Sequence, residues 1–154
     1  MKLLMGMAAI FGLVAQTTFA DVDCKPIHAV QHDVLVTEGC LSPVGFCAEG
    51  TVMGNHGLDG ASFFSALAFD PIPDDPRGRQ VVPGISTYTT DEGTLTISDV
   101  SVLDSVRGTF AGIGKIIKGT GRFAGASGDI FTFGRVLLDG VSFTTDVAGE
   151  LCLQ

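Results

Sequence analysis

Basic side chains are scarce in this sequence of 154 residues, which has 9 lysines and arginines against 17 aspartates and glutamates; among the aromatic residues it has one tyrosine and no tryptophan beside 11 phenylalanines. The net charge of −8 repels a phosphate backbone, so we do not expect nucleic acid as a partner. No Cys-X-X-Cys pair occurs, and on a strand His28 and His32 would lie roughly 13 Å apart, so we expect no metal site. No nucleophile motif is present, and the catalytic residues of any activity stay unknown at this point.

Long apolar runs are also missing, except at the N-terminus. Residues 3–14 carry no charge, follow Lys2 and precede the small-residue pattern Thr18-Phe19-Ala20. This run is shorter than the ~20 residues that span a membrane, and the pattern predicts a secretory signal peptide over residues 1–20, cleaved after Ala20. We therefore expect a secreted or periplasmic protein with no stable membrane insertion after cleavage.

Four cysteines follow the predicted cleavage site. An even number of cysteines in an exported chain predicts two disulfides. A local Cys40–Cys47 bond would leave Cys24–Cys152 to join the two ends of the chain, whereas Cys24–Cys40 with Cys47–Cys152 is the rival pairing. The sequence leaves both open.

Helical periodicity is nearly absent, and apolar and polar residues alternate instead, as in β-strands. Glycine, with 21 residues, supplies bends, and Asp139-Gly140 is typical of a hairpin turn. Closing the sheet would remove its exposed edges, which favours an all-β fold with an eight-stranded antiparallel β-barrel over a β-sandwich. The predicted strands are 29–37, 47–53, 61–69, 85–90, 94–102, 108–117, 128–138 and 141–151.

A glycine-rich segment at 119–128 lies between two predicted strands. A phosphate-binding loop would need a helix after the glycines, but the following Ile130-Phe131-Thr132-Phe133 is typical of a strand, so we expect no nucleotide cofactor. We predict a structural turn in which at least one glycine has a positive φ. Its four glycines are Gly119, Gly121, Gly125 and Gly128.

This segment, with Arg122-Phe123 at its centre, resembles the corresponding turn of the allene oxide cyclase-like and dirigent-like barrels. Gly93-Thr94-Leu95, Gly108-Thr109-Phe110 and the end Gly149-Glu150-Leu151-Cys152 agree with the resemblance, which covers about 47–152. It implies a calycin-like barrel with an interior cavity. The matched residues are architectural, and the catalytic residues of a cyclase cannot be placed on this chain, so function has to be argued from a site.

Three parts of the chain are expected: the signal peptide at 1–20, an N-terminal segment at 21–46 with one strand and a cysteine-containing loop, and the barrel at 47–154. Within the barrel, 70–84 contains four prolines and is expected to be a long loop, either a lid or a disordered linker.

The candidate site residues come from the predicted strands. Tyr88 is either an acid–base group in the cavity or a packing residue. Asp146 would line the cavity if the polar face of its strand pointed inward, and would otherwise face solvent. At Asp99 the apolar alternation changes phase, which suggests a bulge or the end of a strand. Phe131 and Phe133 share one strand face and Ile130 and Val136 the other, so one pair should remain outside the barrel core.

Three hypotheses of function remain. The first is an exported barrel that binds a small apolar ligand without catalysis. The second is a cyclase or isomerase acting on an unsaturated lipid-like or terpenoid-like substrate, which an open cavity with an inward aspartate or tyrosine would favour. The third is a secreted protein that associates with copies of itself, which a filled barrel would favour.

Overall fold

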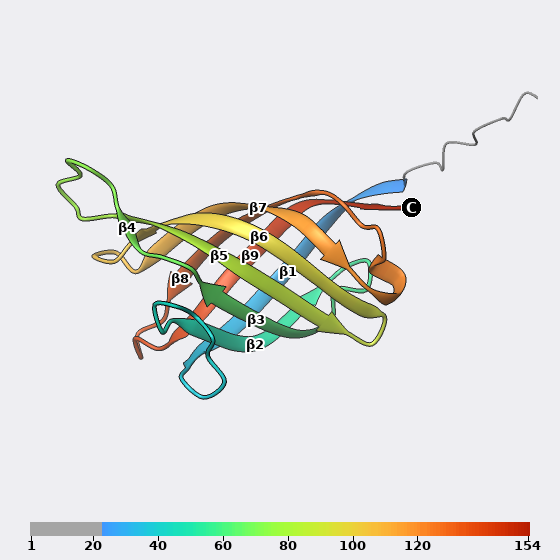
Figure 1. Ribbon diagram of the computed structural model, residues 1–154, viewed down its shortest axis with the longest axis horizontal. Coiled ribbons are helices and arrows are strands. Elements are labelled where there is room, and N and C mark those ends of the chain that lie inside the picture. The colour runs from blue at the N-terminus through green and yellow to red at the C-terminus, as the bar shows by residue number, and fades with distance from the viewer. Residues whose placement is uncertain (1–22) are drawn as a thin grey trace, which may run out of the picture.

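The computed structural model describes residues 23–154, which form a closed antiparallel β-barrel (Figure 1). The predicted signal peptide lies outside the described residues. No helix in residues 23–154 is long and apolar enough to cross a membrane.

Nine strands and one short 3-10 helix make up the fold. The sheet order is β3-β2-β1-β9-β8-β7-β6-β5-β4, and pairing of β3 with β5 closes eight strands into the barrel, with β4 as an appendage. All eight predicted strands are present, and the observed elements are β1 (Asp23–Val36), β2 (Cys47–Gly54), β3 (Gly60–Ala66), β4 (Asp70–Pro71), β5 (Gln80–Thr90), β6 (Gly93–Asp104), β7 (Thr109–Gly119), η1 (Gly121–Phe123), β8 (Asp129–Val136) and β9 (Ser142–Leu153).

The segment 21–46 is not separate from the barrel as far as it is described. β1 pairs with β9 from Asp23 to Val34 and with β2 from Ala29 to Val36, so it is an integral barrel strand. The N-terminal end of β1 is fixed covalently, because Cys24 lies opposite Cys152 in the β1–β9 ladder and is bonded to it. The second disulfide, Cys40–Cys47, closes the loop between β1 and β2. The local pairing considered from the sequence is therefore the one observed.

The inner face of the barrel is polar in two stretches where valines alternate with polar residues. In β1, Val30 and Val34 are 37% and 46% exposed on the outside, while Gln31 and Asp33 are buried inside. The same inversion occurs at the second half of β6, where Val100 is exposed and Asp99 points inward. The change of phase predicted at Asp99 is not observed. Leu95, Ile97 and Asp99 all point inward, and the inward face changes from apolar to polar along the strand. The register irregularity of β6 and β7 instead lies between Thr96 and Ile97.

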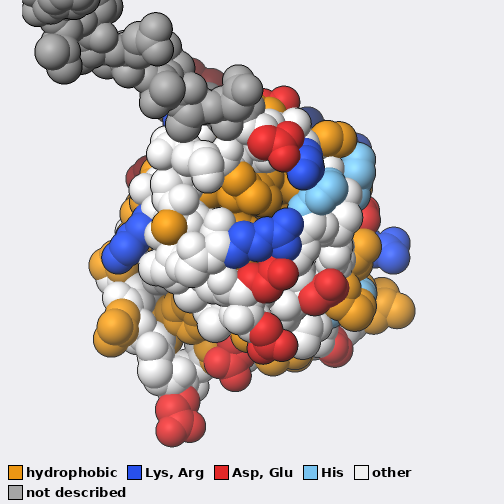
Figure 2. Space-filling model, turned by 90° about the vertical axis from the view of Figure 1, so that its right-hand side faces the viewer, with side chains coloured by type: hydrophobic (Ala, Val, Ile, Leu, Met, Phe, Trp, Pro, Cys, Tyr) orange, Lys and Arg blue, Asp and Glu red, His pale blue; other side chains and the backbone are white. Residues whose placement is uncertain are grey.

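One half of the barrel is a packed apolar core. Its end is closed by η1, whose Phe123 is fully buried between the strand ends. Figure 1 shows this end at the right, beside the C-terminus, and Figure 2 looks directly onto it. The core around Phe123 consists mainly of Ile27, Val52, Leu58, Leu95, Ile97, Ile116, Ile130, Val147 and Leu151.

The glycine-rich segment forms this plug. Gly121, Gly125 and Gly128 have φ values of 58°, 73° and 144°, which confirms the prediction of positive φ. A Cβ atom at Gly119 would lie 1.8 Å from the carbonyl oxygen of Phe123, so the turn also needs a close backbone approach. Arg122 lies outside and forms an ion pair with Glu92 in the β5–β6 turn. The segment therefore has an architectural role.

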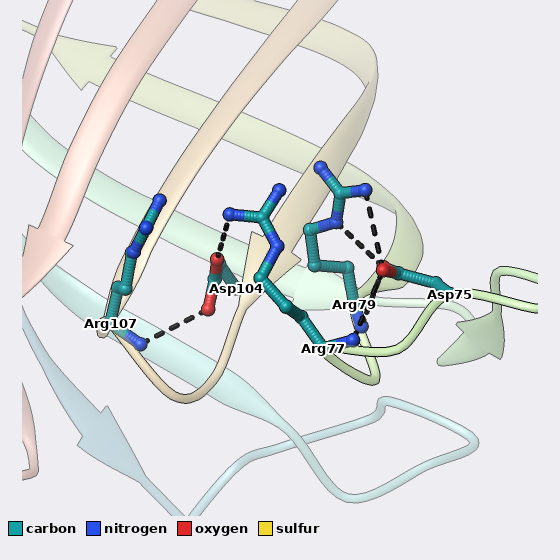
Figure 3. A network of polar contacts seen from close by, with 5 residues as sticks. All are labelled: Asp75, Arg77, Arg79, Asp104 and Arg107. Atoms are coloured by element: carbon teal, nitrogen blue, oxygen red, sulfur yellow. Dashed lines mark hydrogen bonds and ion pairs between the residues drawn. The ribbon is translucent and has the colours of Figure 1, made fainter.

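The expected loop at 70–84 is shorter than predicted. Residues from Gln80 onward belong to β5. Pro83 lies within this strand, and Gln80 and Val81 pair with β4. The remaining turn extends away from the barrel at the left of Figure 1. It is tied internally by Asp75, which accepts hydrogen bonds from the Arg79 backbone and side chain, as Figure 3 shows.

A second tie joins this turn to the barrel. Arg77 forms an ion pair of 3.6 Å with the buried Asp104 at the end of β6, and Asp104 also accepts a hydrogen bond from the backbone of Arg107 (Figure 3). The arrangement anchors the turn beside the β6–β7 loop.

The outer face carries the second apolar set. Phe131 and Phe133 are 53% and 60% exposed, and Ile113 lies opposite Phe131 on the neighbouring strand. Ile130 is buried in the core and Val136 faces the interior. The prediction that one of the two sets stays outside the barrel core is confirmed.

Candidate functional site

The half of the barrel opposite the plug contains a cavity of about 320 Å³. Side chains from all eight barrel strands line it, together with residues of the loops at that end of the barrel. Two of the lining loop residues, Ser105 and Gly140, are exposed to solvent, so the mouth lies between the β6–β7 and β8–β9 loops. No residue in 70–81, which includes the β4–β5 turn, lines the cavity.

The wall near the mouth is aromatic. Phe46 lies at the centre of an edge-to-face cluster, with ring centroids 5.4 Å from Phe69, 6.1 Å from Phe143 and 6.3 Å from Phe64. Phe110 extends the cluster from the other side of Phe143 at 6.4 Å. Gly134 makes room for Phe110, since a Cβ atom there would lie 2.1 Å from the ring. The result is an apolar lining that suits an apolar ligand.

The inner end of the cavity is polar. Tyr88 donates a hydrogen bond of 3.0 Å from its hydroxyl to Oε1 of Gln31, and Gln31 donates from Nε2 to Asp33. Ser62 donates to the other carboxylate oxygen of Asp33. All four side chains are buried, which places a connected polar network between the apolar core and the aromatic wall.

Burial changes the acid–base behaviour of this network. It raises the pKa of the Asp33 carboxyl, although hydrogen bonds from Ser62 and Gln31 and the charge of His32 oppose the shift. Burial also raises the pKa of Tyr88, and the charges of Asp33 and Asp99 act in the same direction. Tyr88 is therefore a neutral hydrogen-bond donor across the physiological pH range.

A second carboxyl, Asp99, lies on β6 at the same level. Its Oδ2 accepts a hydrogen bond of 2.6 Å from Ser86 Oγ, and burial raises its pKa against the effect of that bond. Within the described residues its Oδ1 has no hydrogen-bond partner, and no fully buried side-chain oxygen is left unpaired there, so Oδ1 is accessible from the cavity. Gly114, its ladder neighbour, packs closely against it, since a Cβ atom there would lie 3.0 Å from Asp99 Cβ.

The cavity has an acidic character. Asp33 and Asp99 line it, and none of the lining residues is a lysine, arginine or histidine. Two arginines of the mouth end are paired outside the cavity, Arg79 with Asp75 and Arg77 with Asp104, and Arg107 of the β6–β7 loop is not among the lining residues. An anionic group placed at the polar end would therefore meet carboxyl groups without a basic partner.

The two candidate residues from the sequence separate in the structure. Tyr88 is 2% exposed and lies in the polar network, where it serves both as a packing residue and as a donor. Asp146 is exposed on the outer face of β9, because Thr145 and Val147 are the residues of that strand that point inward. Asp146 is thus not part of the cavity, and neither are Gly119, Gly121, Gly125 and Gly128 of the plug or the four bonded cysteines.

Sequence reasoning missed Gln31, Asp33, Ser86 and Asp99. The signal was present as polar residues alternating with valines, in Gln31 and Asp33 of β1 and again around Asp99 of β6. Valines normally mark the core side of such a strand, and that rule concealed the polar interior.

No protein-family model matches the chain, and no curated protein shows significant similarity to it.

Proposed function

We propose that this protein takes one small, predominantly apolar molecule into the open half of its barrel. The observation that carries the proposal is the cavity of about 320 Å³, whose aromatic wall leads to a buried polar end. Its size lies at the lower end of the roughly 300–1,000 Å³ of typical ligand pockets. Burial of apolar ligand surface against this wall supplies the affinity, and Asp99, Tyr88 and their partners orient the polar end of the ligand.

Export is part of the proposal. The signal-peptide pattern and the two disulfides, which are typical of oxidising compartments, both support a secreted or periplasmic binding protein. The glycine-rich plug supports a distant relationship to the allene oxide cyclase-like and dirigent-like barrels. Self-association through the outer face around Phe131 and Phe133 stays a prediction, which sedimentation equilibrium can test.

The second candidate function, an isomerase or cyclase, is favoured by a specific observation. Asp33 and Asp99 are inward carboxyls whose pKa burial raises, and a carboxyl of that kind can donate a proton to an apolar substrate and recover it from another position. An inward acid in an open cavity is the feature expected to favour this class. The binding step is common to both functions, so the chemical fate of the ligand distinguishes them.

Filling the cavity tests the proposal. Ala48 on β2 is buried and lines the cavity, so Ala48→Leu should occupy ligand space, while the matched control Ala61→Leu adds the same atoms to an exposed position on β3. With phenylbutanol as the probe in titration calorimetry, we expect Ala48→Leu to weaken binding at least about tenfold and Ala61→Leu to leave it unchanged.

Thermal unfolding of both variants checks that the barrel is intact. Equal binding by the two folded variants would contradict a site inside the barrel. Chromatography of the ligand recovered from protein of the native host, before and after incubation with fresh protein, then separates the two functions. A binding protein leaves the retention time unchanged, whereas an isomerase converts the molecule to an isomer of the same mass and a different retention time.

A further inference from the structure

We propose, on the basis of the proposed function, that the ligand is an organic amine: its apolar body packs against the aromatic wall, and its protonated nitrogen binds Asp99 at the polar end of the cavity. The inference goes beyond an apolar ligand because it assigns the charge and the hydrogen-bonding sense of the polar end. Two independent features of the cavity support it, the direction of its hydrogen bonds and the sign of its charge.

The first feature is that most of the donors at the polar end already have an acceptor within the protein. The hydroxyl of Tyr88 donates to Gln31, an amide hydrogen of Gln31 is donated to Asp33, and Ser62 donates to Asp33 as well. Ser86 donates to Asp99, and Ser101 donates over 3.4 Å to the carbonyl oxygen of Val82.

What is left for a ligand is an acceptor. Asp99 Oδ1 has no partner within the described chain and is reachable from the cavity. The hydroxyls of Thr132 and Thr145, which also line the cavity, can accept as well as donate. A ligand group with several N–H donors can satisfy all of these acceptors, whereas a carboxylate, which only accepts, cannot satisfy Asp99 Oδ1.

The second feature is charge. Asp33 and Asp99 are the charged residues among those that line the cavity, and no lysine, arginine or histidine lines it with them. The charge of the neighbouring His32 acts on Asp33, whereas no basic group within residues 23–154 acts on Asp99 in this way. An ammonium group would supply the missing counter-charge, and by stabilising the ionised form it would also reverse the effect of burial on the carboxyl. Asp33 already has both oxygens engaged by Ser62 and Gln31, so Asp99 is the direct partner.

A series of three probes with one apolar body tests the inference: phenylbutylamine, phenylbutanol and phenylbutanoate, each titrated calorimetrically into the mature, disulfide-bonded protein at neutral pH. We expect the amine to bind at least about tenfold more tightly than the alcohol, and the carboxylate to bind most weakly, because a charge-assisted bond adds roughly that factor.

Two isosteric variants locate the effect. Asp99→Asn should reduce amine binding at least about tenfold and change alcohol binding less than about threefold. The control Asp146→Asn removes the same charge from the outer face and should change neither, and thermal unfolding verifies that both variants fold.

The outcomes keep this inference separate from the proposed function. Alcohol binding without a preference for the amine, or equal effects of Asp99→Asn and Asp146→Asn, would overturn the amine assignment and leave the apolar ligand site standing. Tighter binding of phenylbutanoate than of phenylbutylamine would also overturn the assignment. Failure of all three probes to bind would overturn both proposals.

Discussion

Replacing Phe123 with alanine should destabilise the barrel strongly, because this side chain seals its closed end. Phe123 is fully buried in the apolar core. An aromatic side chain buries roughly 150–250 Å². At about 25 cal/mol per Å², this burial contributes about 4–6 kcal/mol. Alanine keeps part of that area, and the cavity left behind adds a further cost, so we expect a loss of about 3–5 kcal/mol in the free energy of unfolding.

The control is Phe133→Ala, which removes the same atoms from an outer position that is 60% exposed. Its expected cost is below about 2 kcal/mol, since less than half of the side chain is shielded from water. Guanidinium denaturation of both oxidised variants, followed by extrapolation to water, gives the two values.

Ligand binding by Phe123→Ala gives a second test. The cavity lies in the other half of the barrel, so Phe123→Ala should leave the affinity for phenylbutanol unchanged under conditions where the variant is folded. A cost for Phe123→Ala no larger than that for Phe133→Ala would refute the view that the glycine-rich turn is a structural plug.

Three further predictions concern the covalent and electrostatic framework. Removing the Cys24–Cys152 bond, which spans 128 residues, should lower the free energy of unfolding by about 5 kcal/mol, against about 2.5 kcal/mol for the Cys40–Cys47 bond, which spans seven residues. Denaturation of the two variants in which both cysteines of one bond are replaced by alanine measures these losses, and a larger loss for the short loop would contradict the chain-entropy argument. Burial raises the pKa of Asp99 above its ordinary value of 3.8, so its contribution to stability is present below about pH 4 and is lost as pH rises through the raised pKa. Asp99→Asn should therefore unfold at a higher temperature than the parent protein at neutral pH, and a lower unfolding temperature would contradict a buried, destabilising carboxyl. Gly128→Val should lower stability by a few kcal/mol, because its φ is 144° and a Cβ atom would lie 1.9 Å from the carbonyl oxygen of Glu150, whereas an unchanged melting temperature would show that the turn tolerates a side chain.

The pH dependence has an opposing contribution on the acid side. Hydrogen bonds from Arg79 lower the pKa of Asp75 to about 2, so the stabilisation that this carboxylate provides is present above its ordinary pKa and is lost as pH falls towards 2. Asp75 lies in the β4–β5 turn, and its titration should loosen that turn without opening the barrel.

The strands were predictable because local chemistry and tertiary structure agree for most of the chain. Alternation such as Leu95 and Ile97 against threonines identifies β6, and in the structure these two side chains are in the core. The plug was predictable for a related reason, since glycines such as Gly121 and Gly128 are placed where backbone conformation excludes other residues.

The site was not predictable in the same way. The open half of the barrel carries polar residues such as Asp33 and Asp99 on its inner face, and a sequence pattern cannot distinguish an inner polar face from a solvated one. The hydrogen bond between Tyr88 and Gln31 joins residues 57 positions apart, and only the closure of β3 on β5 fixes the barrel around them. The start of β5 was missed because Pro83 suggested a loop, although a carbonyl oxygen of proline can still accept, as it does here from Leu67.

The most direct test of the binding cavity is a set of nuclear Overhauser contacts between phenylbutanol and the isotope-labelled mature protein. The account predicts one bound molecule per chain, with its ring protons close to the side chains of Phe64, Phe110 and Phe143 on the inner wall. Contacts to Phe131 and Phe133 on the outer face instead, or no contact at all at a saturating probe concentration, would contradict it.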